Sequence, residues 1–147
     1  MATRVNDLLK EKGNQVWTVE VDASIKQALL LMAEKQIGAV PVVEKGHIRG
    51  MFSERDYVNY VAATGEPAIT EPVRKLMVHP VFYVGPEQTC EDCLSLMTGK
   101  NIRHVPVVDD DNLVGIVTIG DVLRRLLTEK NSIIENLEHF AWKNIIG

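Results

Sequence analysis

The chain has 147 residues, 46% of them hydrophobic, and a formal net charge of −4 at pH 7. A chain of this length can bury one ordinary core, or form two small halves that share one core. Lys and Arg are scattered rather than gathered in a basic stripe, which argues against nucleic acid as a partner. No apolar run reaches the roughly 18 to 20 residues of a membrane span and residues 1–15 lack the apolar core of a secretory signal, so we expect a cytoplasmic protein without a membrane partner.

After an expected helical segment at residues 1–15, the first regular elements follow in a clear order. VWTVEV is typical of a short strand. Ser24 with Gln27 forms a capping box, which predicts a helix that begins there and carries Ala28, Leu29 and Met32 on one face. AVPVVE and HIRGMF are then two strands rich in β-branched or apolar residues, and the turn KG between them predicts a hairpin.

The stretch GMFSERD, from Gly50 to Asp56, ends this hairpin and begins a second helix. Its Ser53 and Asp56 again have the spacing of a capping box, in which hydroxyl and carboxylate satisfy N–H groups of the first helical turn. Taken alone, the stretch predicts strand, turn and helix and nothing more. Gly65, Pro67 and Pro72 then interrupt any regular element, which indicates a linker.

The same series recurs in the second half of the chain. At an offset of about 65 positions, residues 16–58 align without a gap with residues 81–123 and share about thirteen identities, including two copies of VPVV. GIVTIGD, from Gly115 to Asp121, repeats GMFSERD in the same register. The chain is therefore a tandem duplication of a β-α-β-β-α unit, with domains expected at 16–66 and 67–128.

Residues 129–147 restart with another capping box at Ser132 and Glu135. Apolar residues recur there at helical spacing up to Ile145, which predicts an amphipathic helix. The helix could dock on its own domain or join two subunits, and its long apolar face favours a homodimer.

The strand pattern I-x-x-V-P-V-V-[DE], followed by G-h-h-[ST]-x-x-D (h, apolar) and present twice, resembles a tandem pair of CBS domains, also called a Bateman module, of the stand-alone bacterial type. The resemblance covers Val16 to about Thr128. It implies two pseudo-symmetric α/β repeats packed through their sheets, with adenine nucleotides bound in clefts between them. It also implies a regulatory module without catalysis that requires no cofactor, takes AMP as its first candidate ligand and signals to an unidentified protein.

By this resemblance, one nucleotide cleft is built around Asp121. A carboxylate on the first turn of a helix can accept hydrogen bonds from both ribose hydroxyls, and a hydroxyl at the cap lies near the positive end of the helix dipole, where a phosphate is favoured. The pure capping role stays open for both side chains. The residues expected at this cleft are Thr18, Ala23, Ile37, Arg103, His104, Ile116, Thr118 and Asp121.

The other cleft is built around Asp56 and is expected to be weaker. The positions equivalent to the cations Arg103 and His104 are Gly38 and Ala39 there. Arg55 could compensate, although an arginine on the first turn of a helix is more often simply solvated. The residues expected at this cleft are Met51, Ser53, Arg55, Asp56, Tyr83, Gln88 and Ile102.

Other chemistry has little support. Cys90 and Cys93 form a C-x-x-C, the spacing of a redox pair, but they align with the apolar Ile25 and Ala28 and are better explained as core residues. No metal-ligand spacing and no catalytic motif occurs, so we expect no metal and no enzyme. A redox-interaction protein that uses the two cysteines and a ligand-free dimeric scaffold remain the alternatives.

Overall fold

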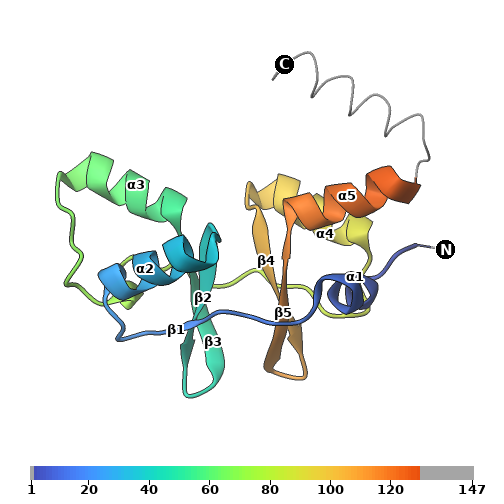
Figure 1. Cartoon of the computed structure of the whole chain (residues 1–147), viewed down its shortest axis with the longest axis horizontal. Coiled ribbons are helices and arrows are strands. Elements are labelled where there is room, and N and C mark those ends of the chain that lie inside the picture. The colour runs from blue at the N-terminus through green and yellow to red at the C-terminus, as the bar shows by residue number, and fades with distance from the viewer. Residues whose placement is uncertain (1, 130–147) are drawn as a thin grey trace, which may run out of the picture. The chain divides into compact units, whose positions relative to one another are not determined.

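The computed structural model describes residues 2–129, and the same mixed α/β series occurs twice within them (Figure 1). The predicted helix at residues 129–147 lies outside the described residues, apart from Glu129, which ends α5. The elements are α1 (Val5–Lys12), β1 (Val19–Glu20), α2 (Ile25–Lys35), β2 (Ala39–Glu44), β3 (His47–Ser53), α3 (Glu54–Thr64), the 3-10 helix η1 (Val73–Lys75), α4 (Cys90–Lys100), β4 (His104–Asp109), β5 (Asn112–Thr118) and α5 (Ile119–Glu129).

The chain forms two compact units. We call residues 15–83 with 108–114 the first-repeat unit, and residues 2–14, 84–107 and 115–129 the second-repeat unit. The helix α1 therefore belongs to the unit that contains the second repeat, although it precedes the first repeat in the sequence. The domain boundaries expected from the sequence stay a prediction.

The first-repeat unit contains a three-stranded sheet in the order β1-β2-β3. The strand β1 runs parallel to β2 and pairs Val19 with Val42, and β2 and β3 form the expected antiparallel hairpin. Between the strands, Lys45 and Gly46 both have positive φ angles of 51° and 81°. Positive angles at both central residues are those of a type I′ turn, whose twist matches that of the strands.

In the second repeat, β4 and β5 form the equivalent hairpin, and Asp110 and Asp111 take the positive φ angles of its turn. The first strand expected here is reduced to a single parallel bridge between Val84 and Val107. The reason is local. Immediately after Val84 the chain turns, with the Gly85 N–H donating to the side chain of Gln88 at 2.8 Å.

Within residues 2–129, capping boxes form at Ser24, Ser53, Thr89 and Thr118. In α2 and α4, the Ser24 and Thr89 hydroxyls accept from the N–H groups of Gln27 and Asp92, each at 3.1 Å. The same helices end at residues in the left-handed conformation, Gln36 and Asn101, which are equivalent positions of the two repeats. Because each such bond satisfies an otherwise unpaired N–H group, the caps set where each helix begins relative to its strands.

The core of the first-repeat unit lies between α2 and the sheet. Ile25 and Ala28 of α2 and Val40, Val42 and Phe52 of the strands are all fully buried. Complete burial of an aliphatic or aromatic side chain contributes roughly 1.5 to 3 kcal/mol. This packing holds the start of β2 and the end of β3 together. Of the predicted site residues, Met51 and Ser53 lie in β3, and Ile37 lies just before β2.

The core of the second-repeat unit includes α1. Val5, Leu8 and Leu9 of this helix are buried, and the Val5 N–H donates to the carbonyl of Gln88 at 2.8 Å. In α4, Cys90 and Cys93 are fully buried beside these elements. The helix α1 is thus packed into the core of this unit.

The two repeated glycines each allow a close approach. A Cβ atom at Gly50 would lie 2.7 Å from Met77 Sδ and 3.0 Å from the carbonyl oxygen of Val78. A Cβ atom at Gly115 would lie 2.6 Å from Leu9 Cδ2. These close approaches are made by the segment that follows η1 at Gly50 and by α1 at Gly115. Within residues 2–129, no helix is both long enough and apolar enough to cross a membrane.

Candidate functional site

The first candidate carboxylate, Asp56, lies on the first turn of α3 and folds back on the end of β3. Its Oδ2 accepts from the Ser53 N–H at 2.9 Å and from the Ser53 hydroxyl at 2.8 Å, while the Asp56 N–H donates to Ser53 Oγ at 3.1 Å. All of these contacts are made to one residue. The other carboxylate oxygen, Oδ1, has no hydrogen-bond partner among the described residues and can still accept a donor.

The second candidate carboxylate, Asp121, has the same local geometry and two additional cations. Its Oδ2 accepts from the Thr118 N–H at 2.9 Å, and the Asp121 N–H donates to Thr118 Oγ1 at 3.1 Å. The Lys12 ammonium lies 2.6 Å from Oδ2, and Arg124 Nη2 lies 3.1 Å from Oδ1. The Asp121 side chain is only 12% exposed, so it is more buried than the side chains of Lys12 and Arg124.

The pKa of Asp121 lies below its ordinary value. Burial acts to raise this pKa, but the hydrogen bonds from Lys12 and Thr118, with the positive charge of Lys12, act in the opposite direction and outweigh it. The carboxylate is therefore ionised at neutral pH, which is the form that accepts hydrogen bonds from a ligand.

In both repeats, the candidate helix is joined to the residues before VPVV. The Glu54 N–H donates to the carbonyl of Gly38 at 3.0 Å, and the Ile119 N–H donates to the carbonyl of Arg103 at 2.9 Å. Each bond attaches the first turn of a helix to the start of a strand. The two parts of the sequence motif therefore lie side by side within each repeat.

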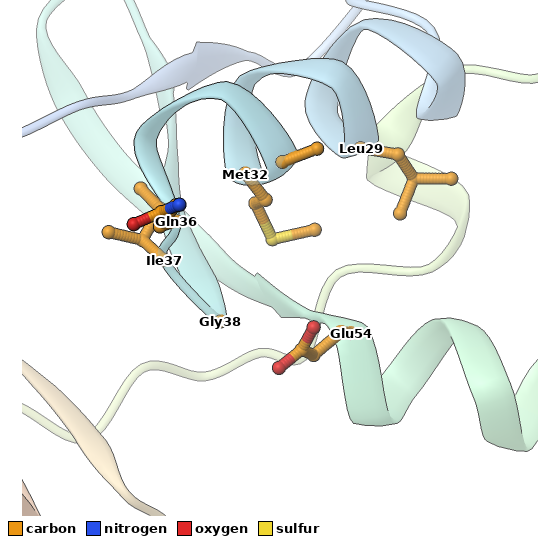
Figure 2. Close-up of a pocket in the computed structure, with 7 residues that line it drawn as sticks. Leu29, Met32, Gln36, Ile37, Gly38 and Glu54 are labelled. Carbon is orange, nitrogen blue, oxygen red and sulfur yellow. The ribbon is translucent and has the colours of Figure 1, made fainter.

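A cavity of about 300 Å³ opens at this junction in the first-repeat unit (Figure 2). Apolar side chains of α2 line one side, and the Glu54 carboxylate stands at the other, at the beginning of α3. The lining residues are Leu29, Met32, Ala33, Gln36, Ile37, Gly38 and Glu54. Of these, only Ile37 was expected at a site, and it comes from the same unit as Glu54.

The remaining predicted residues divide between the two units. Of the cleft assigned to Asp121, the first-repeat unit holds Thr18, Ala23 and Ile37, and the second-repeat unit holds Arg103, His104, Ile116, Thr118 and Asp121. Of the cleft assigned to Asp56, the first-repeat unit holds Met51, Ser53, Arg55, Asp56 and Tyr83, and the second-repeat unit holds Gln88 and Ile102. Their grouping across the two units stays a prediction.

Within each unit, the structure joins some of these residues directly. Ile116 and Asp121 share a contact, because the Lys12 ammonium also lies 3.0 Å from the Ile116 carbonyl oxygen. Arg55, Tyr83 and Arg103 are exposed. Gln88, by contrast, uses its side-chain oxygen to accept from the Gly85 N–H in the local turn.

No sequence pattern indicates the role of Lys12 or predicts a second cavity, of about 530 Å³, in the first-repeat unit. That cavity is lined by Val21, Asp22, Glu44, Arg49, Arg74, Met77 and His79. Its arginines are already paired, Arg49 with Glu44 at 3.3 Å and Arg74 with Asp22. Because these charges balance, the cavity does not attract an anion by itself.

The environment of the two cysteines suits packing. Burial, with smaller contributions from nearby acidic groups, raises the pKa of the Cys90 thiol to about 11 and that of Cys93 to about 12. A reactive cysteine needs the opposite, a lowered pKa and access to solvent. Among residues 2–129, no group of three or more His, Cys, Asp or Glu side chains is arranged to hold a metal ion.

Two copies of a strand, helix, hairpin and helix, each with a hydroxyl–carboxylate pair at the start of the last helix, define a tandem α/β module. The chain belongs to the CBS domain family, whose model matches residues 5–63 and 73–128. It is 36% identical over 127 residues to the CBS domain-containing protein YhcV of Bacillus subtilis (strain 168), a match that covers 85% of this chain and 90% of that protein.

Solved structures of CBS-domain proteins share this fold. The CBS-domain containing protein ATU1752 from Agrobacterium tumefaciens has a TM-score of 0.80 and 39% identity, covering 84% of this chain and 98% of that one. The CBS domain pair of protein MJ0100, solved in complex with 5-methylthioadenosine and S-adenosyl-L-methionine, has a TM-score of 0.73 and 26% identity, covering 84% of this chain and 99% of that one. The family and the fold expected from the sequence are thereby confirmed.

Proposed function

We propose that this CBS domain pair is a non-catalytic regulatory module that binds adenosine-containing ligands, AMP first among them, and passes the signal to a partner protein. The observation that carries the proposal is the repeated pair of a strand-end hydroxyl and a first-turn carboxylate, Ser53 with Asp56 and Thr118 with Asp121. Each carboxylate is oriented by its own capping bonds, so a ligand does not have to order it.

The chemistry of the pair fits a ribose. An ionised carboxylate can accept hydrogen bonds from two neighbouring hydroxyls, and the adjacent helix N-terminus favours a negatively charged group beyond them. Both ligands of the MJ0100 pair are adenosine derivatives, which supports an adenosine ligand for a chain with the same fold. The apolar side of the cavity, formed by residues of α2 and Ile37, offers a surface on which a flat base can be buried.

Ligand binding regulates a partner only if two conformations of the protein bind the ligand with different affinities.

We propose that the protein acts as a homodimer. Support comes from Val58 of α3 and Leu123 of α5, which occupy aligned positions and are 62% and 41% exposed. Such apolar side chains, repeated on equivalent helices, are typical of a surface that meets a second copy. Light scattering should give the mass of a dimer, and a monomer at working concentration would contradict this part of the proposal.

The test of ligand binding is a thermal-shift and calorimetric screen of AMP, ADP, ATP, NAD and adenosine. A ligand at about 100 times its dissociation constant should stabilise the fold by roughly 2.7 kcal/mol. Asp56→Asn and Asp121→Asn keep an acceptor for the capping N–H but remove the charge, so each should weaken binding at its cleft at least about tenfold.

Asp92→Asn is the matched control. Asp92 makes the same capping box with Thr89 on α4, at 3.0 and 3.1 Å, but lies outside the proposed clefts. It should reproduce any loss of helix stability without the loss of affinity. If no adenosine compound stabilises the wild-type protein, the proposed binding of adenosine-containing ligands is wrong.

A further inference from the structure

The carboxylate of Asp121 is already occupied in the described structure, whereas that of Asp56 is not. Asp121 Oδ2 accepts from both Thr118 and Lys12, and Oδ1 accepts from Arg124. Asp56 makes contacts only with Ser53, and they leave Oδ1 without a partner among residues 2–129. Two carboxylates at equivalent positions therefore differ in what a ribose would have to displace.

Of the two cations on Asp121, Lys12 is the stronger competitor. Its ammonium lies 2.6 Å from the carboxylate and its side chain is 31% exposed, whereas Arg124 lies at 3.1 Å and is 72% exposed. An exposed side chain is screened by water and moves freely, so its ion pair contributes little. Lys12 is also held by a second acceptor, the carbonyl oxygen of Ile116, at 3.0 Å.

That second acceptor marks another difference between the repeats. Met51, the residue equivalent to Ile116, has its carbonyl bonded by the Val78 N–H at 2.7 Å and its N–H bonded to the Val78 carbonyl at 3.0 Å. In the first repeat, the backbone N–H of Val78 donates to the Met51 carbonyl. In the second repeat, the side-chain ammonium of Lys12 donates to the equivalent carbonyl of Ile116, and a side chain can turn away without a change in the backbone.

The helix α1 keeps the ammonium near the site. Val5, Leu8 and Leu9 anchor the helix in the core, with Leu9 packed where Gly115 has no side chain. Glu11, next to Lys12, pairs with Arg125 of α5. Because the helix is fixed and only the four-carbon stem of Lys12 has to move, the ammonium remains at a high effective concentration beside Asp121.

We propose that Lys12 is a built-in competitor for the ribose hydroxyls at Asp121 and so sets the affinity and the salt dependence of this cleft. The proposal rests on the proposed function, because it assumes that Asp121 binds a ribose. A ribose that donates to the carboxylate replaces the ammonium on Oδ2, and Lys12 swings away from both Asp121 and Ile116 while α1 stays in place.

The probe is adenosine, which is neutral, so its own charge does not influence the result. All proteins carry Asp56→Asn, which leaves Asp121 as the intact ribose carboxylate. In this background, Lys12→Met keeps the apolar stem and removes the charge, and adenosine should bind about three to ten times more tightly, as expected for loss of a partly exposed charge-assisted bond. Lys10→Met on the same helix is the control, since Lys10 is exposed and has no ion-pair partner among the described residues.

Salt provides a second, independent readout. Raising the salt from about 50 mM to about 500 mM weakens ion pairs that solvent reaches, and the Lys12 side chain is 31% exposed. Adenosine should therefore bind the Lys12-containing protein more tightly at high salt, and this gain should vanish in Lys12→Met. The affinity of a neutral ligand ordinarily changes little with salt, so an adenosine affinity that rises with salt would indicate competition by Lys12. Melting curves on each variant establish that the fold is kept.

The outcomes separate the two proposals. If adenosine binds, Asp121→Asn abolishes that binding and Lys12→Met binds no more tightly than Lys10→Met, the competitor role of Lys12 is wrong and the proposed function stands. An affinity that falls with salt in the presence of Lys12 would overturn the competitor role equally. If neither the Lys12 protein nor Lys12→Met binds adenosine or AMP, both proposals fail together.

Discussion

The ammonium nitrogen of Lys12 lies 2.6 Å from Oδ2 of Asp121, while Asp56, at the equivalent position of the first repeat, has no ion-pair partner among residues 2–129. The duplication therefore preserves the strand, the hydroxyl and the carboxylate, but the two copies have different neighbours. The Ile116 carbonyl and Asp121 both contact Lys12 of α1, whereas Met51, equivalent to Ile116, contacts Val78 in the chain after α3. The functional difference that we propose between the clefts would follow from these segments.

The acid stability of the second-repeat unit should depend on Lys12. Burial acts to raise the pKa of Asp121, but the bonds from Lys12 and Thr118 lower it below its ordinary value. A carboxyl with a lowered folded-state pKa contributes stability above its unfolded pKa, and that contribution is lost as the pH falls through the folded pKa. Lys12→Met should raise the pKa of Asp121 and shift acid unfolding to higher pH.

Carbon-detected NMR titration of the Asp121 carboxyl measures this pKa directly, with Lys10→Met as the control. An unchanged pKa in Lys12→Met would mean that the pair contributes little in solution.

The two repeated glycines should differ in their tolerance of a methyl group. At Gly50, the added Cβ would meet the Val78 carbonyl oxygen at 3.0 Å, and backbone cannot move without disturbing the Met51–Val78 bridge. At Gly115 it would meet the tip of the Leu9 side chain, which can change its rotamer. Gly50→Ala should lower the free energy of unfolding by about 1–3 kcal/mol and Gly115→Ala by less. Urea unfolding of both variants gives the comparison, and an equal loss would contradict this reasoning.

The two cysteines should behave as core residues. Burial is the first cause of a pKa of about 11 at Cys90 and about 12 at Cys93, so few thiolates exist at pH 8. Modification by a thiol reagent at that pH should be at least about tenfold slower in the folded protein than in urea. The double variant Cys90→Ile, Cys93→Ala copies the aligned residues Ile25 and Ala28 and should keep ligand binding. Rapid modification of both thiols in the native state would revive the redox alternative.

Much of the fold could be predicted from the sequence because its determinants are local. The capping boxes at Ser24, Ser53, Thr89 and Thr118 depend on residues three positions apart, and alternation and turn residues define the hairpins. Because the unit is duplicated, each of these patterns occurs twice in the sequence. The weak strand before α4 was overestimated because the turn at Gly85 ends it after one bridge.

The neighbours of the candidate site could not be predicted in the same way. Lys12 and Asp121 are separated by 109 positions, and nothing in the stretch KEKG distinguishes Lys12 from Lys10. Their contact arises because Leu9 packs on Gly115, a tertiary relationship that no local pattern encodes. Glu54 at the cavity was missed for a related reason, since its role follows from the bond that attaches α3 to Gly38.

Arg103 should distinguish phosphorylated from neutral ligands. Its backbone carbonyl is fixed by the Ile119 N–H at 2.9 Å, whereas its guanidinium is exposed and can turn towards a ligand. The equivalent residue in the first repeat is Gly38, which has no charge to offer. Arg103→Ala keeps the backbone bond and removes only the cation. Because a hydrogen bond to a charged group contributes roughly 1.5 to 3 kcal/mol, the variant should lose at least about tenfold in AMP affinity and much less for adenosine.

Calorimetry with both ligands on Arg103→Ala and on Arg49→Ala tests this prediction. Arg49 is an exposed arginine of β3 that pairs with Glu44 at 3.3 Å, so it controls for a general loss of positive charge. If only Arg103→Ala loses AMP affinity, the guanidinium of Arg103 binds the phosphate and the cleft around Asp121 is the one that prefers nucleotides. Equal losses of AMP and adenosine affinity in Arg103→Ala would show instead that the residue supports the cleft as a whole, and the assigned asymmetry between the two clefts would be wrong.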